Sequence, residues 1–234
     1  MLQLERYLEL PGVHGVAYFR SWWQAPDEGV LNHPLYIRPP SGREHFLWSD
    51  LYESLVRGRS LVSHWLRESF ETLGFTPPHP SIGELEHPDE AVRTRSRKNL
   101  KKLWDPARTR LRRMGWEVEA GTICQLYLKN NAGSSAEMIY VSPCEPGGRI
   151  LLVRVTPRDP ERVAEMAALL QSTVAMADVP LQVEMLDVSR VGGTRTVIDV
   201  KIPFNKLLDG ATGVQEIEEK LSDHVCTIAE RVQR

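Results

Sequence analysis

The sequence predicts an α+β protein, in which a helical, tryptophan-rich amino-terminal region ends in a basic helix–turn–helix pair and an antiparallel sheet covered by two helices follows. Three observations lead to this class. Apolar residues recur at helical spacing in the first half, whereas short runs of alternating apolar and polar residues fill the second half. Glycine and proline separate these runs. The first half also holds all six tryptophans, namely Trp22, Trp23, Trp48, Trp65, Trp104 and Trp116.

Two helices are predicted before the basic segment. The first covers residues 41–56, with Ser41 as its N-cap. The second covers residues 60–75, and Gly74 suits its carboxyl end. Residues 76–88 form a connector that cannot be the interior of a helix, because it contains four prolines.

Residues 93–114 are predicted to form a pair of short amphipathic helices with basic polar sides. Asp105-Pro106 separates the two helices, because aspartate is a good N-cap and proline a good first helical residue. The first helix is expected to bury Leu100 and Trp104, and the second to bury Leu111 while it exposes its arginines, Arg108 included. With this basic helix pair, the first predicted domain spans residues 1–115.

The second predicted domain is an α+β sandwich over residues 116–234. Strands are expected at 116–129, 136–143, 149–157, 181–188 and 196–203, and helices at 159–176 and 213–232. The two helices are expected on one side of the antiparallel sheet. A helix pair followed by a hairpin is also the element order of winged-helix DNA-binding domains, so the segment is winged-helix-like in order alone.

Composition excludes several classes of protein. Hydrophobic residues make up 41% of the 234 positions and charged residues 26%, which is ordinary globular usage. Cys124, Cys144 and Cys226 are widely spaced, which argues against a disulfide framework or a four-ligand zinc site. We find no cofactor motif and no histidine spacing typical of a metal site. The sequence shows neither a signal-peptide apolar region nor a run of ~20 apolar residues, so we expect a cytoplasmic protein without a membrane partner.

The distribution of charge indicates a function. Residues 93–113 carry ten Lys or Arg and only Asp105, hence +9, which leaves −11 on the rest of a chain whose net charge is −2. Such a cluster attracts polyanions. The sequence therefore favours non-enzymatic nucleic-acid binding, with double-stranded DNA as the expected partner, by a dimer or a subunit of a larger assembly. The expected phosphate-binding residues are Arg97, Lys98, Lys101, Lys102, Arg108, Arg110, Arg112 and Arg113.

Two alternatives remain open at this point. Asp187, Asp199 and Lys201 follow the order of acids and lysine in PD-(D/E)xK nucleases, whose carboxylates hold Mg²⁺. That alternative would make the protein a magnesium-dependent enzyme. The other alternative is an adaptor whose basic face docks an acidic protein, with self-association or another protein partner supplying the assembly.

Overall fold

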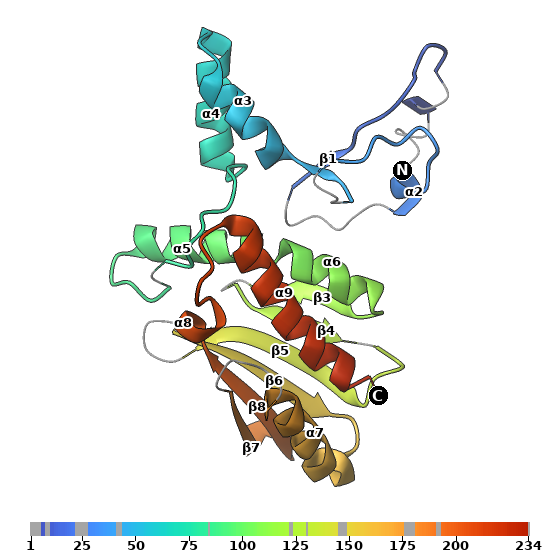
Figure 1. The fold of residues 1–234 in the computed structure, drawn as a ribbon, viewed down its shortest axis with the longest axis vertical. Helices are drawn as coiled ribbons and strands as arrows, with labels where there is room; N and C mark the ends of the chain where they lie inside the picture. The colour runs from blue at the N-terminus through green and yellow to red at the C-terminus, as the bar shows by residue number, and fades with distance from the viewer. Residues whose placement is uncertain are drawn as a thin grey trace. The chain divides into compact units, whose positions relative to one another are not determined.

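A computed structural model describes residues 6–7, 10–21, 28–40, 44–83, 85–121, 124–129, 131–144, 149–175, 181–190 and 193–233. The chain forms two compact units, Met1–Pro77 and Pro78–Arg234. Figure 1 shows the elements of both, and each unit is described by itself below.

The first unit consists of short elements around a cluster of aromatic rings. Its elements are β1 (Phe19–Arg20), α2 (Glu28–Leu31), β2 (Phe46–Leu47), η1 (Trp48–Leu51), α3 (Tyr52–Arg57) and α4 (Leu61–Leu73). Strands β1 and β2 pair in parallel. The ring of Phe19 stacks on that of Phe46 with centroids 5.1 Å apart, and Trp48 lies 6.5 Å from Phe70 and 6.2 Å from Phe75. The carboxyl end of α4 is thereby fixed to β2 and η1.

The two helices predicted in this unit have different outcomes. The helix predicted over 60–75 is confirmed as α4, in which Ser60 Oγ accepts a hydrogen bond from the Ser63 N–H and Gly74 adopts φ 77° at the carboxyl end. The helix predicted over 41–56 begins later, because the Asp50 carboxylate accepts the Leu47 N–H at 2.8 Å and starts the helical segment at Trp48. The proposed cap, Ser41, lies outside the described residues.

The second unit is an antiparallel six-stranded sheet with its helices on one face, so the α+β class is confirmed (Figure 1). The strand order is β3-β4-β5-β6-β8-β7. The strands are β3 (Glu117–Ala120), β4 (Leu126–Lys129), β5 (Ala136–Cys144), β6 (Ile150–Pro157), β7 (Gln182–Arg190) and β8 (Gly193–Pro203). The helices are α5 (Glu90–Leu103), α6 (Asp105–Arg113), η2 (Pro160–Arg162), α7 (Val163–Ala175), α8 (Phe204–Leu207) and α9 (Val214–Arg231).

The core lies between one sheet face and the helices. Strand residues such as Ile139, Val153 and Ile198 are fully buried there, together with Leu111 of α6 and Leu221 of α9. Since successive residues of a strand point to opposite faces, the intervening side chains of the same strands lie on the other face of the sheet.

The basic helix pair belongs to this second unit. The sequence prediction set the domain boundary after residue 115, whereas the two compact units meet between Pro77 and Pro78. The reason is that Leu100, Leu103 and Trp104 are at most 1% exposed and complete the core over the sheet. The single strand predicted over 116–129 is two strands, β3 and β4, which pair with each other; the Gly121 N–H donates to the Gln125 carbonyl at 2.8 Å where they are joined.

Candidate nucleic-acid interface

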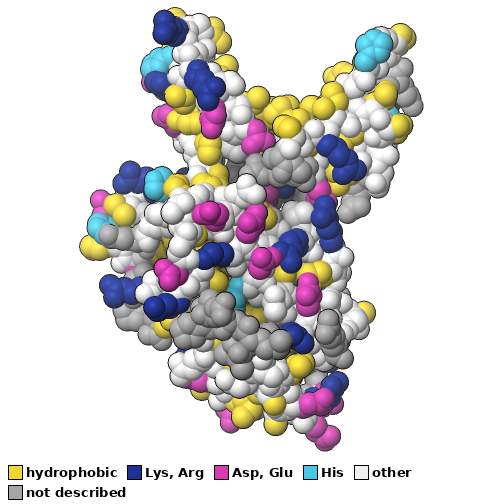
Figure 2. Space-filling model, viewed as in Figure 1, with side chains coloured by type: hydrophobic (Ala, Val, Ile, Leu, Met, Phe, Trp, Pro, Cys, Tyr) yellow, Lys and Arg dark blue, Asp and Glu magenta, His cyan; other side chains and the backbone are white. Residues whose placement is uncertain are grey.

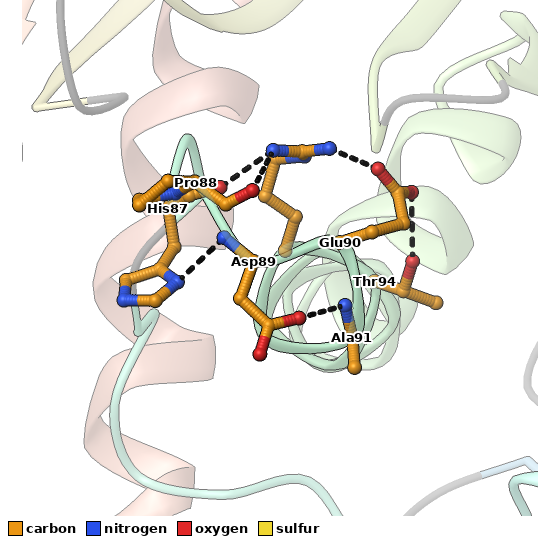
Figure 3. A network of polar contacts seen from close by, with 7 residues as sticks. His87, Pro88, Asp89, Glu90, Ala91 and Thr94 are labelled. Atoms are coloured by element: carbon orange, nitrogen blue, oxygen red, sulfur yellow. Dashed lines mark hydrogen bonds and ion pairs between the residues drawn. The ribbon is translucent and has the colours of Figure 1, made fainter.

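The amino-terminal end of α5 is held by a local network of polar contacts (Figure 3). Asp89 Oδ1 accepts the Ala91 N–H at 2.8 Å, as an N-cap does. The guanidinium of Arg93 donates to the carbonyls of His87 at 2.6 Å and Pro88 at 3.0 Å, and it forms an ion pair with Glu90. Arg93 is therefore used to fix the helix end and is not counted among the cations available to a ligand.

Beyond this network, α5 carries five basic side chains on the part of its surface turned away from the core. Ser96, Leu100 and Leu103 mark the core side. At about 100° per residue, the basic residues occupy an arc of roughly 160° around the opposite side. We call them the α5 strip: Arg95, Arg97, Lys98, Lys101 and Lys102. No acidic residue follows Glu90 within α5, so these charges have no carboxylate neighbour on their own helix.

Exposure differs along the α5 strip. Arg95 and Lys98 are exposed, Arg97 and Lys101 are partly buried, and Lys102 at the edge is only 9% exposed. Burial lowers the pKa of Lys102 to about 8, and the nearby charge of Lys98 adds to the effect. Burial also lowers the pKa of Lys101. Both shifts show that the positive charge of these amines is disfavoured, and an anion bound to the strip would relieve this.

The arginines of α6 are largely committed to the protein itself. Arg108 was expected to be exposed, but this prediction is wrong: its side chain is 2% exposed and pairs with Asp105 at 2.8 Å within the core. Arg110 pairs with Asp223 of α9, and Arg112 donates to the Val118 carbonyl at 3.2 Å. Arg113 is exposed. The pairing with α9 explains why this helix offers few cations to a ligand.

The helix–turn–helix arrangement is not confirmed. Only Trp104 separates α5 from α6, and α6 packs against α9 with its arginines turned to protein partners. The strands that follow are part of the six-stranded sheet and do not form a separate wing. Figure 2 shows Asp and Glu side chains interspersed with Lys and Arg on the face that carries α9. The acids exposed on α9 are Glu216, Glu219, Asp223 and Glu230.

The structure therefore brings together half of the residues predicted to bind phosphate. Arg97, Lys98, Lys101 and Lys102 lie on one helix, while Arg108, Arg110 and Arg112 are held by protein groups. Sequence reasoning missed Arg95. The signal that could have found it is its spacing of three residues from Lys98, which places both on the same side of a helix.

The residues of the nuclease alternative do not converge. Asp187 is paired with Thr196 across β7 and β8, and Asp199 is paired with Glu184. Paired residues share a face and faces alternate along a strand, so the two carboxylates lie on opposite faces of the sheet. Asp199 receives two hydrogen bonds from Arg154, at 2.6 and 2.7 Å, and Lys201 donates to Glu184 at 2.8 Å. One metal ion cannot bridge this arrangement.

Among the residues that the structure describes, no group of three or more His, Cys, Asp or Glu side chains could hold a metal ion. The described helices also include none that is long and apolar enough to cross a lipid bilayer. The thiols of Cys124 and Cys226 are free and buried, and burial raises the pKa of Cys124 to about 11.

Comparison with known proteins gives little further guidance. No family model matches the chain, and no curated protein matches it. One solved structure with a similar fold is that of YbjN from E. coli, described as a candidate transcription regulator. It is 14% identical, with a TM-score of 0.34, and the match covers 58% of this chain and 84% of YbjN. At this TM-score, the similarity is not used to argue for a function.

Proposed function

We propose that the protein binds nucleic acid without catalysis, by contacts of the α5 strip with the phosphate backbone. The observation that carries this proposal is the strip itself, which places Arg95, Lys98 and three further cations on one side of a helix without an acid between them. Like charges at this spacing repel each other, and a phosphate chain would turn that repulsion into attraction.

The size of the strip suits a polyanion. Residues 95–102 span about 10 Å along a helix, and one strand of duplex DNA presents a phosphate every ~3.4 Å along its axis. About two or three phosphates could therefore be contacted at once. Arginine and lysine contacts to phosphate fix position and carry no sequence information, so binding should be nearly independent of sequence. Double-stranded DNA remains the partner that we propose.

The proposal can be tested by removing the two exposed cations of the α5 strip. The double variant Arg95→Ala/Lys98→Ala should bind a labelled duplex roughly 50-fold more weakly at 0.1 M salt, because each counterion released is worth about eightfold there. Folding should be unaffected, since both side chains are exposed. The matched control is Arg162→Ala/Lys206→Ala, which removes two exposed cations of the same unit elsewhere and should bind like the parent.

The same experiment separates the adaptor alternative. If the α5 strip docks an acidic protein, neither the parent nor the control should bind duplex DNA, single-stranded DNA or RNA at low salt. Equal weakening of the strip variant and the control would mean that net charge alone is responsible, and this result would contradict a site on α5.

A further inference from the structure

Helix α4 exposes an unusual amount of apolar surface. None of its thirteen residues is buried. Leu61, Val62, Trp65 and Leu73 are 57–61% exposed, and Leu66 is 44% exposed. A contiguous apolar patch on a surface helix usually marks an interaction site, whereas single exposed apolar residues need no explanation.

The apolar side of α4 faces away from the aromatic cluster of its own unit. The better-covered positions of the helix are Ser63, Arg67 and Phe70, and Phe70 contacts the rings of Trp48 and Phe75. At about 100° per residue, the five exposed apolar side chains lie within an arc of roughly 140° on the other side of the helix. The unit thus uses the more polar side of α4 internally and leaves the apolar side unpartnered within itself.

We propose that α4 pairs antiparallel with α4 of a second copy of this chain. The apolar pattern is almost symmetric about Arg67, as a two-fold interface requires. Antiparallel pairing about that position brings Leu61 opposite Leu73 of the second copy and Trp65 opposite Ser69. A hollow beside Trp65, lined by Glu68, Ser69, Thr72 and Leu73, offers room for the indole ring of the other copy.

Charge favours the same orientation. Arg57 and Arg59 precede α4, whereas Glu68 and Glu71 lie in its second half. Antiparallel pairing places the basic end of one helix near the acidic half of the other, and it also opposes the two helix dipoles favourably. Parallel pairing would place like charges side by side, which is destabilising.

The interface should be weak when it is formed by this helix pair alone. Stable interfaces bury about 1,200 Å² or more, and one pair of thirteen-residue helices provides less. We therefore expect a reversible dimer with a dissociation constant on the order of micromolar, anchored by Trp65, since tryptophan is enriched among residues that dominate binding.

Analytical ultracentrifugation of the full chain tests the surface. The parent should dimerise reversibly as its concentration rises from ~1 to ~100 µM, and Trp65→Ala should weaken association about 30-fold, as loss of a central anchor does. Met185→Ala is the matched control, because Met185 is 55% exposed on β7 and Trp65 is 57% exposed. A parent that stays monomeric, or a control that weakens association as much as Trp65→Ala, would overturn the proposal.

Disulfide trapping tests the orientation. An equimolar mixture of Leu61→Cys and Leu73→Cys chains should give a crosslinked dimer on mild oxidation, because the two positions meet in an antiparallel pair. Each variant alone should not exceed the background of the oxidised parent, since two copies of position 61 would lie about 18 Å apart along the helices. Crosslinking of either variant alone would show parallel pairing and contradict the proposal.

Discussion

Lys102 is the residue for which burial most changes the expected chemistry. The sequence places it on the polar side of an amphipathic helix, but its side chain is buried and its pKa is lowered to about 8. Sequence periodicity could not show this, because the burial depends on how the rest of the unit packs around α5. At pH 9, therefore, most of the charge that Lys102 would contribute to a phosphate contact is lost.

We expect duplex binding to weaken between pH 7 and pH 9 as Lys102 loses its proton, by up to about eightfold at 0.1 M salt if one contact is lost. Fluorescence anisotropy with a labelled duplex at constant salt measures this. Lys102→Met should bind more weakly than the parent at pH 7 and should show a flatter pH dependence. An unchanged pH dependence in Lys102→Met would exclude Lys102 as the titrating group.

His224 gives a second prediction at the residue scale, and it concerns stability. Burial lowers its pKa to about 4 from an ordinary value of 6.5, and its Nε2 has no hydrogen-bond partner among the described residues. Between these values the unfolded chain binds a proton that the folded chain does not. The free energy of unfolding should therefore fall as pH decreases from 6.5 to 4, by up to about 3 kcal/mol.

Urea unfolding at pH 7 and pH 5 measures this loss of stability. His224→Gln removes the titration, so the variant should lose less stability over the same range than the parent. Equal losses in both proteins would show that other groups cause the acid sensitivity.

At the scale of elements, the hairpin of β7 and β8 shows both what the sequence predicts and where the reasoning went wrong. Both strands and their antiparallel order were predicted. A loop of two residues, however, pairs odd positions with even ones, as the register of Arg190 with Gly193 confirms. Asp187 and Asp199 could therefore not share a face, and strand alternation alone could have excluded the nuclease site.

Asp199 instead stabilises the sheet through Arg154 of β6. The carboxylate is 2% exposed and takes two hydrogen bonds from the guanidinium. We expect Arg154→Met to lower the free energy of unfolding by about 3 kcal/mol, because it leaves a buried charge without its partner. The control is Arg195→Met, whose ion pair with Glu137 is exposed and should contribute less than about 1 kcal/mol. Chemical denaturation compares the two, and equal effects would contradict the buried-pair interpretation.

The other elements show what local pattern can and cannot determine. The helices predicted over 159–176 and 213–232 are found as α7 and α9, because their apolar periodicity is long and regular. The helix pair was also found, but the pattern could not show that Arg108 is buried with Asp105 or that Arg110 meets Asp223. Those contacts depend on packing between segments more than a hundred residues apart, which no local pattern encodes.

At the scale of the whole molecule, the division into two units differs from the change in composition along the sequence. Trp104 and Trp116 made residues 1–115 look like one tryptophan-rich region, yet both belong to the core of the second unit. The core cluster lies entirely within residues 78–234. A fragment of residues 78–234 should therefore fold by itself and keep the duplex affinity of the full chain, because it contains the whole α5 strip.

Circular dichroism and anisotropy measure the folding and the binding of this fragment. The fragment lacks α4, so it should also remain monomeric at ~100 µM, where we expect the full chain to dimerise. A fragment that is folded but binds DNA much more weakly would mean that residues 1–77 contribute directly to the interface.

The most direct test of phosphate binding by the α5 strip is the salt dependence of duplex affinity in the full chain. Between about 50 and 200 mM salt, two or three phosphate contacts predict a slope of log K against log[salt] of about −2 to −3. Arg95→Ala/Lys98→Ala should reduce the magnitude of that slope by about two, and Arg162→Ala/Lys206→Ala should leave it unchanged. The absence of duplex binding at 50 mM salt, or a slope that the strip variant shares with the parent, would contradict the proposed function.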